Sequence, residues 1–115
     1  MERRSDCPLS CSLDVIGDRW TLLILRDVLF FDKKHYKDFL NSHEGISTNI
    51  LANRLSKLVS HGLLTKQKDA VNGLMYNYYA TEKAKDLMQV LMQLGKWGNK
   101  HIKNTITIPP LHMHI

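Results

Sequence analysis

The chain has 115 residues, of which 43% are hydrophobic and 23% are charged, with only three prolines and six glycines. A composition this close to the globular average excludes a collagen-like, low-complexity or disordered chain and predicts one domain with one core. The sequence has no run of the ~18 consecutive apolar residues that a membrane span needs, and its N-terminus lacks the apolar segment of a signal peptide. We therefore expect a soluble, cytoplasmic protein without a membrane partner.

The formal net charge is +5, and the middle of the chain holds the whole excess. Residues 33–68 contain seven basic side chains against two acidic ones, whereas the basic and acidic residues elsewhere cancel. Such a segment favours a polyanion as partner, although a charge run by itself is more often a solvated surface.

Hydrophobic side chains recur at spacings of three and four residues along most of the chain, which predicts helices. The five predicted helices cover residues 6–16, 19–31, 34–40, 48–61 and 81–103. Four of them start at a side chain that can accept a hydrogen bond from the first turn, so the expected N-caps are Asp6, Asp18, Ser47 and Thr81. Gly45 and Gly62 are expected to form the turns on either side of the fourth helix.

A β-hairpin is predicted between the fourth and fifth helices. Residues 63–68 and 74–80 are β-prone, and the segment between them ends in Asn72-Gly73, a strong hairpin turn signal. After residue 104 the chain has two adjacent prolines and no periodicity. We expect a mostly helical α+β domain over residues 1–104 and an extended or disordered tail over residues 105–115.

The predicted elements follow the order of a winged helix-turn-helix: a helix, a short turn with a glycine, a second helix and a hairpin. In that fold the second helix enters the major groove of DNA. The fourth predicted helix has no acidic residue, and opposite its apolar stripe lie short polar side chains flanked by cations, which suit base edges and phosphates. The residues predicted to bind DNA, from this helix and the hairpin, are Thr48, Asn49, Asn53, Arg54, Ser56, Lys57, Lys66, Lys68 and Asn72. The alternative is a basic domain whose polar face only meets water.

Several segments also carry a family resemblance. They are Cys7-Pro8, the run LDVIGDRWTLLILR over residues 13–26, Gly45-Ile46-Ser47, Leu51-x-x-Arg54-Leu55-x-x-Leu58 and Gly62-Leu63. Together they closely resemble the HxlR-type winged-helix transcriptional regulators over residues 7–103. The resemblance implies a homodimer that binds double-stranded operator DNA. The wing departs from the family pattern, because Val71-Asn72-Gly73 replaces a segment that usually contains proline.

Cys7 lies at the expected start of the first helix, close in sequence to Arg3 and Arg4. A helix N-terminus and nearby cations favour the thiolate, the reactive form, so Cys7 is a candidate redox sensor. The resemblance adds that several family members respond to electrophiles or oxidants through a matching cysteine. A packing role is the alternative. Cys11 is badly placed for a bond with Cys7 of the same helix, so a switch would use a mixed disulfide, alkylation or a bond from Cys7 to the partner's Cys7 or the partner's Cys11.

The last predicted helix has more apolar surface than one domain needs. Its apolar side chains spread over more than one face, and its two glycines lower helix propensity but permit close helix approach. We therefore predict that this helix, with the first helix beside it, forms a two-fold dimer interface that presents paired recognition helices. The predicted interface residues are Leu87, Leu91, Met92, Leu94, Gly95, Trp97 and Gly98.

The sequence offers no recognisable catalytic or cofactor site. Its six histidines form no ligand set of known spacing, and it has neither a glycine-rich phosphate loop nor a nucleophile elbow, so no metal or cofactor is expected. Asp14, Asp18 and Asp27 are expected to pair with Arg19 or Arg26. The sequence thus predicts a non-enzymatic, dimeric DNA-binding regulator that responds to an electrophile or small ligand. A winged helix that binds another protein instead of DNA is the alternative.

Overall fold

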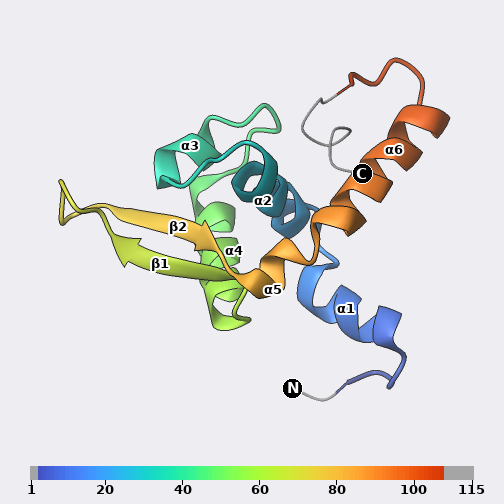
Figure 1. Ribbon diagram of the computed structural model, residues 1–115, viewed down its shortest axis with the longest axis horizontal. Helices are drawn as coiled ribbons and strands as arrows, with labels where there is room; N and C mark the ends of the chain where they lie inside the picture. The colour runs from blue at the N-terminus through green and yellow to red at the C-terminus, as the bar shows by residue number, and fades with distance from the viewer. Residues whose placement is uncertain (1–2, 108–115) are drawn as a thin grey trace.

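The computed structural model describes residues 3–107. Within this range the elements follow the order α1 (Pro8–Ile16), α2 (Arg19–Phe30), α3 (Tyr36–Leu40), α4 (Thr48–Ser60), β1 (Leu64–Lys68), β2 (Tyr76–Ala80), α5 (Glu82–Lys85) and α6 (Met88–His101) (Figure 1). The two strands are antiparallel, with Leu64 opposite Ala80 and Lys68 opposite Tyr76. The predicted fold class, mostly helical with a small hairpin, is confirmed. None of the helices in this range is both long and apolar enough to cross a bilayer.

A side-chain cap starts three of the helices described. Asp18, Ser47 and Thr81 each accept a hydrogen bond from a backbone N–H in the first turn of α2, α4 and α5, at 3.0, 3.2 and 3.2 Å, as predicted. The prediction for Asp6 was wrong, because Cys7 is the N-cap of α1 and no side chain caps that helix. The proline at the first position of α1 has no N–H, so one of the donors that a helix start leaves unpaired is absent there.

Two glycines set the limits of α4. Gly45 and Gly62 have φ angles of +71° and +73°, in the left-handed region that other residues adopt only at a cost. Gly45 lies in the turn between α3 and α4, and Gly62 follows the C-cap of α4. Both predicted turns are therefore confirmed.

The hairpin turn differs from its prediction. The strands are joined by a loop over residues 69–75, and neither Asn72 nor Gly73 has the positive φ of a two-residue Asn-Gly turn. The carboxylate of Asp69 accepts the backbone N–H groups of Val71 and Asn72 at 3.1 and 2.8 Å, so this side chain organises a wider loop.

The last predicted helix is divided in two. α5 ends at Lys85, and the N–H of Leu87 donates to the carbonyl of Ala84, three residues back, which tightens the chain before α6 begins. This break lets Ala84, which is fully buried, enter the core separately from α6. Residues 105–107 have no helix or strand, and the rest of the predicted tail, 108–115, lies outside the described residues.

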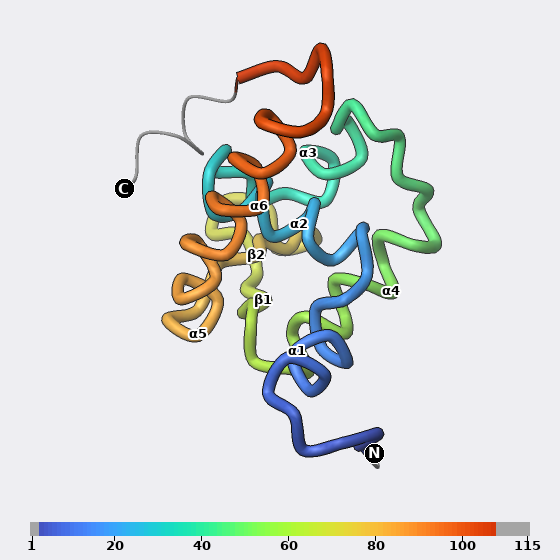
Figure 2. Tube along the Cα trace, turned by 90° about the vertical axis from the view of Figure 1, so that its right-hand side faces the viewer, coloured from blue at the N-terminus to red at the C-terminus, as the bar shows by residue number. Residues whose placement is uncertain are grey.

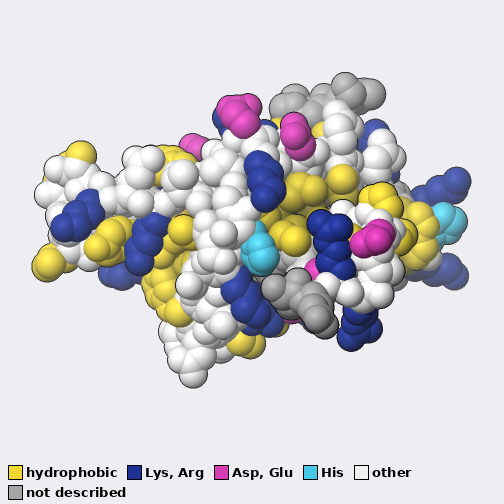
Figure 3. Space-filling view, turned by 90° about the horizontal axis from the view of Figure 1, so that it is seen from below, with side chains coloured by type: hydrophobic (Ala, Val, Ile, Leu, Met, Phe, Trp, Pro, Cys, Tyr) yellow, Lys and Arg dark blue, Asp and Glu magenta, His cyan; other side chains and the backbone are white. Residues whose placement is uncertain are grey.

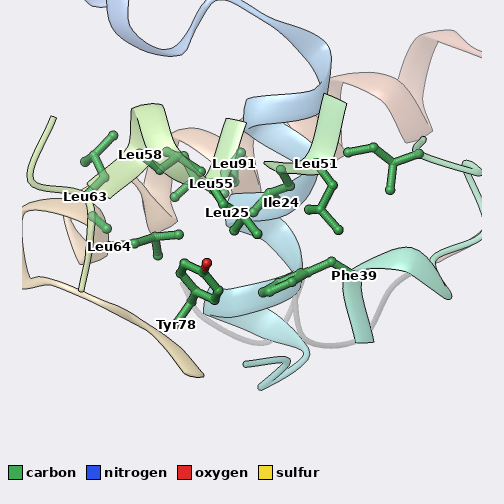
Figure 4. Packing of buried hydrophobic residues seen from close by; sticks show 12 residues of the cluster. Ile24, Leu25, Phe39, Leu51, Leu55, Leu58, Leu63, Leu64, Tyr78 and Leu91 are labelled. Carbon is green, nitrogen blue, oxygen red and sulfur yellow. The ribbon is translucent and has the colours of Figure 1, made fainter. Parts of the chain in front are cut away.

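The core lies between α2 and α4 and is closed by the sheet and α6. Leu51, Leu55 and Leu58 of α4 are at most 1% exposed and converge with Ile24 and Leu25 of α2 (Figure 4). Viewed from the side, α4 lies at one flank of the molecule and α5 and α6 at the other, with α2 between them (Figure 2). The remaining face of α4 is therefore directed away from α6.

Two residues predicted at the dimer interface belong to the interior of the chain. Leu91 is 7% exposed and Met92 is fully buried, and Leu91 joins the core cluster beside α2 and α4. The helical period predicted a second apolar stripe on this helix, but periodicity does not say which stripe faces the core. In the folded chain the face of α6 that carries Leu91 and Met92 packs against the core, whereas Leu94 and Trp97 remain exposed.

Candidate nucleic-acid interface

The outer face of α4 is polar and exposed because the leucine stripe fixes the rotation of the helix. This outer face consists of Thr48, Asn49, Asn53 and Ser56, all exposed, with the exposed Lys57 at its edge. The helix contains no acidic residue. Amide and hydroxyl groups of this size can reach base edges from a helix lying in the major groove.

A groove of about 380 Å³ separates the outer face of α4 from the hairpin, which we call the wing (residues 64–80). Ser56 and Ser60 line it from α4, and Lys66 and Tyr78 line it from the wing. Tyr36 closes one side, and its hydroxyl donates to the carbonyl of Thr48 at 3.1 Å, which ties α3 to the first turn of α4. Ser60 and Tyr36 were missed by the sequence analysis, because the packing of α3 and the wing against α4 places them here.

Most cations of the basic segment face solvent. Five lysines are exposed and take part in no ion pair among the described residues: Lys34, Lys37, Lys57, Lys66 and Lys68. Lys66 also lies over the ring of Tyr76, with its Nζ 4.3 Å from the ring centroid. In contrast, Lys33 pairs with the buried Asp27 at 3.5 Å. The exposed lysines can therefore meet phosphate groups without first breaking an internal ion pair.

Arg54, predicted to bind DNA, is half-buried and engaged in hydrogen bonds within the protein. Its Nε and Nη2 donate to the two carboxylate oxygens of Asp18 at 2.8 and 3.1 Å, and its Nη1 donates to Oδ1 of Asn53 at 2.7 Å. The hydrogen bond from Arg54 lowers the pKa of Asp18 from 3.8 to about 2. Asp18 was expected to pair with Arg19 or Arg26, so this partner is a correction. The ion pair joins α4 to the first turn of α2 and orients Asn53.

A second charged cluster fixes the turn that precedes α4. Nη1 and Nη2 of Arg26 donate to the two carboxylate oxygens of Glu44 at 2.8 and 2.9 Å, and this lowers the pKa of Glu44. The same guanidinium donates from Nε and Nη2 to Oδ1 of Asp27, which is only 2% exposed. The pairing of Asp27 with Arg26 is as predicted, whereas the role of Glu44 was missed, since 18 residues separate it from Arg26.

Asn72 lies in the wing loop and is exposed. Its Oδ1 accepts the backbone N–H of Leu74 at 3.1 Å, so this side chain also shapes the loop. The pKa of Asp69 is lowered, first by the hydrogen bond that its carboxylate accepts from the backbone N–H of Asn72 and then by those from the Asn77 amide and the Val71 N–H.

Cys7 is exposed at the N-cap of α1. The guanidinium of Arg3, expected to stabilise a thiolate, lies instead 3.7 Å from the carboxylate of Asp6. The Sγ of Cys11 contacts the carbonyl of Ser5 at 3.4 Å. The thiol of Cys7 is thus open to reagents, and one of the two cations expected beside it, Arg3, pairs with an acid.

A shallow apolar hollow of about 710 Å³ lies on the other side of the molecule, on α6. We call it the α6 surface; it is formed by Gln89, Val90, Gln93, Leu94 and Trp97. Leu94 and Trp97 are 53% and 58% exposed, which is high for side chains of this size. Of the other predicted interface residues, Leu87, Gly95 and Gly98 are half-buried.

The order α3, turn, α4 and wing, with a polar outer face on α4, defines a winged helix-turn-helix protein. The chain belongs to the HxlR-like helix-turn-helix family, whose model matches residues 15–106.

Relatives and solved structures agree with this assignment. The uncharacterised HTH-type transcriptional regulator Rv3095 of Mycobacterium tuberculosis is 33% identical over 91 residues, which cover 79% of this chain and 56% of the relative. The chain therefore spans about half the length of this curated relative. The structure of PA1607, described as a candidate transcription factor, has a TM-score of 0.81 at 33% identity and covers 91% of this chain and 73% of its own. Quinone-bound YodB of Bacillus subtilis has a TM-score of 0.65 at 28% identity, over 82% of this chain and 99% of its own.

The Asp18–Arg54 ion pair gives a testable pH dependence. Asp18→Asn keeps a side chain that can cap α2 but removes the charge, so we expect a loss of about 1 kcal/mol or less at pH 7, the range of solvent-accessible ion pairs. Because the pKa of Asp18 is lowered from 3.8 to about 2, the wild-type advantage should be full above pH 3.8 and disappear as the pH falls to about 2. Urea unfolding of the wild type and of Asp18→Asn across this pH range measures the difference in their free energies of unfolding. A constant difference at every pH would contradict the ion-pair assignment.

Proposed function

We propose that this chain is a sequence-specific DNA-binding transcriptional regulator that acts as a homodimer. The observation that carries the proposal is the outer face of α4, which presents amide and hydroxyl groups beside exposed lysines and lacks acidic groups. The family of the chain and the HTH-type regulators among its relatives support the same function.

In this proposal Thr48, Asn49, Asn53 and Ser56 contact base edges in the major groove, because their short side chains leave the helix close to the DNA. The exposed lysines at the rim, Lys57, Lys66 and Lys68, contact phosphate groups. Arg54 contributes through its hydrogen bond to Asn53, which holds the amide in one orientation. Asn72 acts at the wing, where it also maintains the loop.

Binding to duplex DNA should depend strongly on salt. Five or six phosphates neutralised per dimer would give a slope of about −5 in a plot of log K against log salt. Fluorescence anisotropy with a labelled duplex, selected by the protein from a random-sequence pool, measures this slope. Absence of binding at low salt would contradict the proposal and favour a winged helix that binds another protein.

Two variants separate base contacts from phosphate contacts. Asn53→Ala should lose about 1–3 kcal/mol per half-site on the selected duplex and much less on random DNA, whereas Lys66→Ala should weaken both and reduce the salt slope by about 2, because the dimer loses two phosphate contacts. Lys100→Ala, an exposed change near the end of α6, serves as the control and should leave both affinities unchanged. Equal losses on the two duplexes for Asn53→Ala would remove the base-reading role.

The homodimer is proposed to form through the α6 surface, centred on Leu94 and Trp97, with the half-buried Leu87, Gly95 and Gly98 as further members of the interface. The apolar side chains of this surface are exposed to solvent in the described part of the chain, and contact with a second copy would bury them. Because α6 lies on the side of the molecule away from α4, a second copy docked there leaves the outer face of α4 free for DNA (Figure 2). Leu9 and Leu13 of α1 are also exposed and would extend the interface.

The double variant Leu94→Asp/Trp97→Asp should convert the dimer to a folded monomer, since both side chains are more than half exposed in the single chain. Sedimentation velocity at micromolar concentration measures the change. Asn41→Asp, which adds a charge at an exposed site beyond α3, should remain a dimer. A wild-type monomer, or a dimeric double variant, would contradict the interface. Leu91→Asp and Met92→Asp would test folding instead, because both residues are in the core.

Cys7 is proposed as the site where an electrophile or oxidant weakens DNA binding. Its thiol is exposed at the start of α1, the helix proposed to extend the dimer interface, and the solved relative YodB exists in a quinone-bound form. A bulky group on Cys7 would press on the interface and alter the spacing of the two α4 helices.

Cys7→Ser should bind the selected duplex normally and remain bound after treatment with diamide or benzoquinone. The matched variant Cys11→Ser should dissociate from the duplex after this treatment as the wild type does, because Cys11 is only partly exposed. Anisotropy before and after treatment, with mass spectrometry to locate the adduct, measures both. Identical release of wild type and Cys7→Ser would show that Cys7 is not the sensor.

A further inference from the structure

The far end of the wing carries two hydrophobic side chains that face only solvent. Val71 is 96% exposed and Leu74 is 92% exposed, the highest values among the large hydrophobic residues of the described chain. We call these two residues the wing tip. Figure 1 shows that the loop carrying them projects beyond α3 and α4, at the point of the hairpin most distant from the core.

The wing tip is held in place by the loop beneath it. The Asp69 carboxylate accepts the N–H groups of Val71 and Asn72, and its other oxygen accepts the side-chain amide of Asn77 at 3.1 Å. Backbone hydrogen bonds between Asp69 and Met75 and between Met75 and Asn72 close the loop. The two side chains are therefore presented outward by an organised loop, at little entropic cost on binding.

The surroundings of the wing tip are cationic. Lys66 and Lys68 lie on one face of β1, two residues apart, and Lys66 lines the groove shared with α4. Figure 3 shows Lys or Arg side chains directly beside the hydrophobic end of the hairpin. Asp69 is the acid of the wing, and hydrogen bonds within the loop occupy its carboxylate. The wing thus combines an apolar tip with cationic side chains. Duplex DNA is complementary to this combination, because its stacked bases are apolar and lie between two phosphate chains.

We propose that Val71 and Leu74 form an apolar wedge that enters the minor groove of the DNA bound by α4 and partly unstacks one base step, which bends the duplex. This inference rests on the proposed DNA-binding function. Apolar wedges of this size part base steps and kink DNA in minor-groove binding proteins. The wedge adds affinity by burying apolar surface, and it releases no counterions from the phosphates, so its contribution is independent of salt.

The test uses the duplex that the wild-type protein selects from a random-sequence pool, with donor and acceptor dyes at its two ends. Val71→Ser/Leu74→Ser should bind about a hundredfold more weakly, since each of the two wings of the dimer loses about tenfold when its two partly covered aliphatic side chains are removed, with an unchanged salt slope. Energy transfer between the dyes should rise when the wild type binds and stay near the free-DNA value with the double variant. Since both side chains face solvent, the variant should unfold at the wild-type temperature.

Two controls define the comparison. Val71→Ile/Leu74→Met keeps apolar side chains and should retain the wild-type affinity and energy transfer. Ile106→Ser removes an equally apolar, 77% exposed side chain beyond α6 and should also behave as the wild type. Wild-type affinity and bending in Val71→Ser/Leu74→Ser would overturn the wedge and leave DNA binding intact. Failure of the wild type to select any duplex would overturn the DNA-binding proposal and the wedge together.

Discussion

The burial of Leu51, Leu55 and Leu58 is the constraint on which the rest of the structure depends. Each fully buried leucine contributes about 1.5–3 kcal/mol relative to an exposed one, so the stripe holds α4 in one rotation against α2. A different rotation would expose these leucines and bury the amides of the opposite face without partners, which costs further free energy. The same packing that stabilises the core thus determines which side chains are offered to a partner.

Two ion pairs complete the placement of α4, one before its start and one along its length. Arg26 holds Glu44 in the preceding turn, and Arg54 holds Asp18 at the start of α2. One pair ties α4 and the other ties the turn before it to α2 or its N-cap, so the position of the outer face depends on the same helix that forms the centre of the core. Within the basic segment Arg54 therefore serves internal positioning and Lys33 pairs with Asp27, whereas the other five lysines remain at the surface.

The sequence predicted what local chemistry determines, namely the three caps, the two turn glycines and the leucine stripe of α4. It could not predict Arg54 with Asp18 or Arg26 with Glu44, because these partners are 36 and 18 residues apart and meet only after folding. On α6 the pattern contained two apolar stripes, and only packing decided that Leu91 and Met92 face inward. The wing loop differed because the Asp69 side chain competes with the Asn-Gly turn for backbone N–H groups.

The proposed division of the molecule into a DNA-binding face on α4 and a separate α6 surface can be tested directly by NMR. Addition of the selected duplex to isotope-labelled protein should shift the amide signals of Thr48, Asn49, Asn53 and Ser56 most strongly. The amides of Gln89, Val90 and Gln93, on the other side of the molecule, should change little (Figure 2). Large shifts on α6 with an unperturbed outer face of α4 would contradict the central claim that the leucine stripe turns α4 toward DNA.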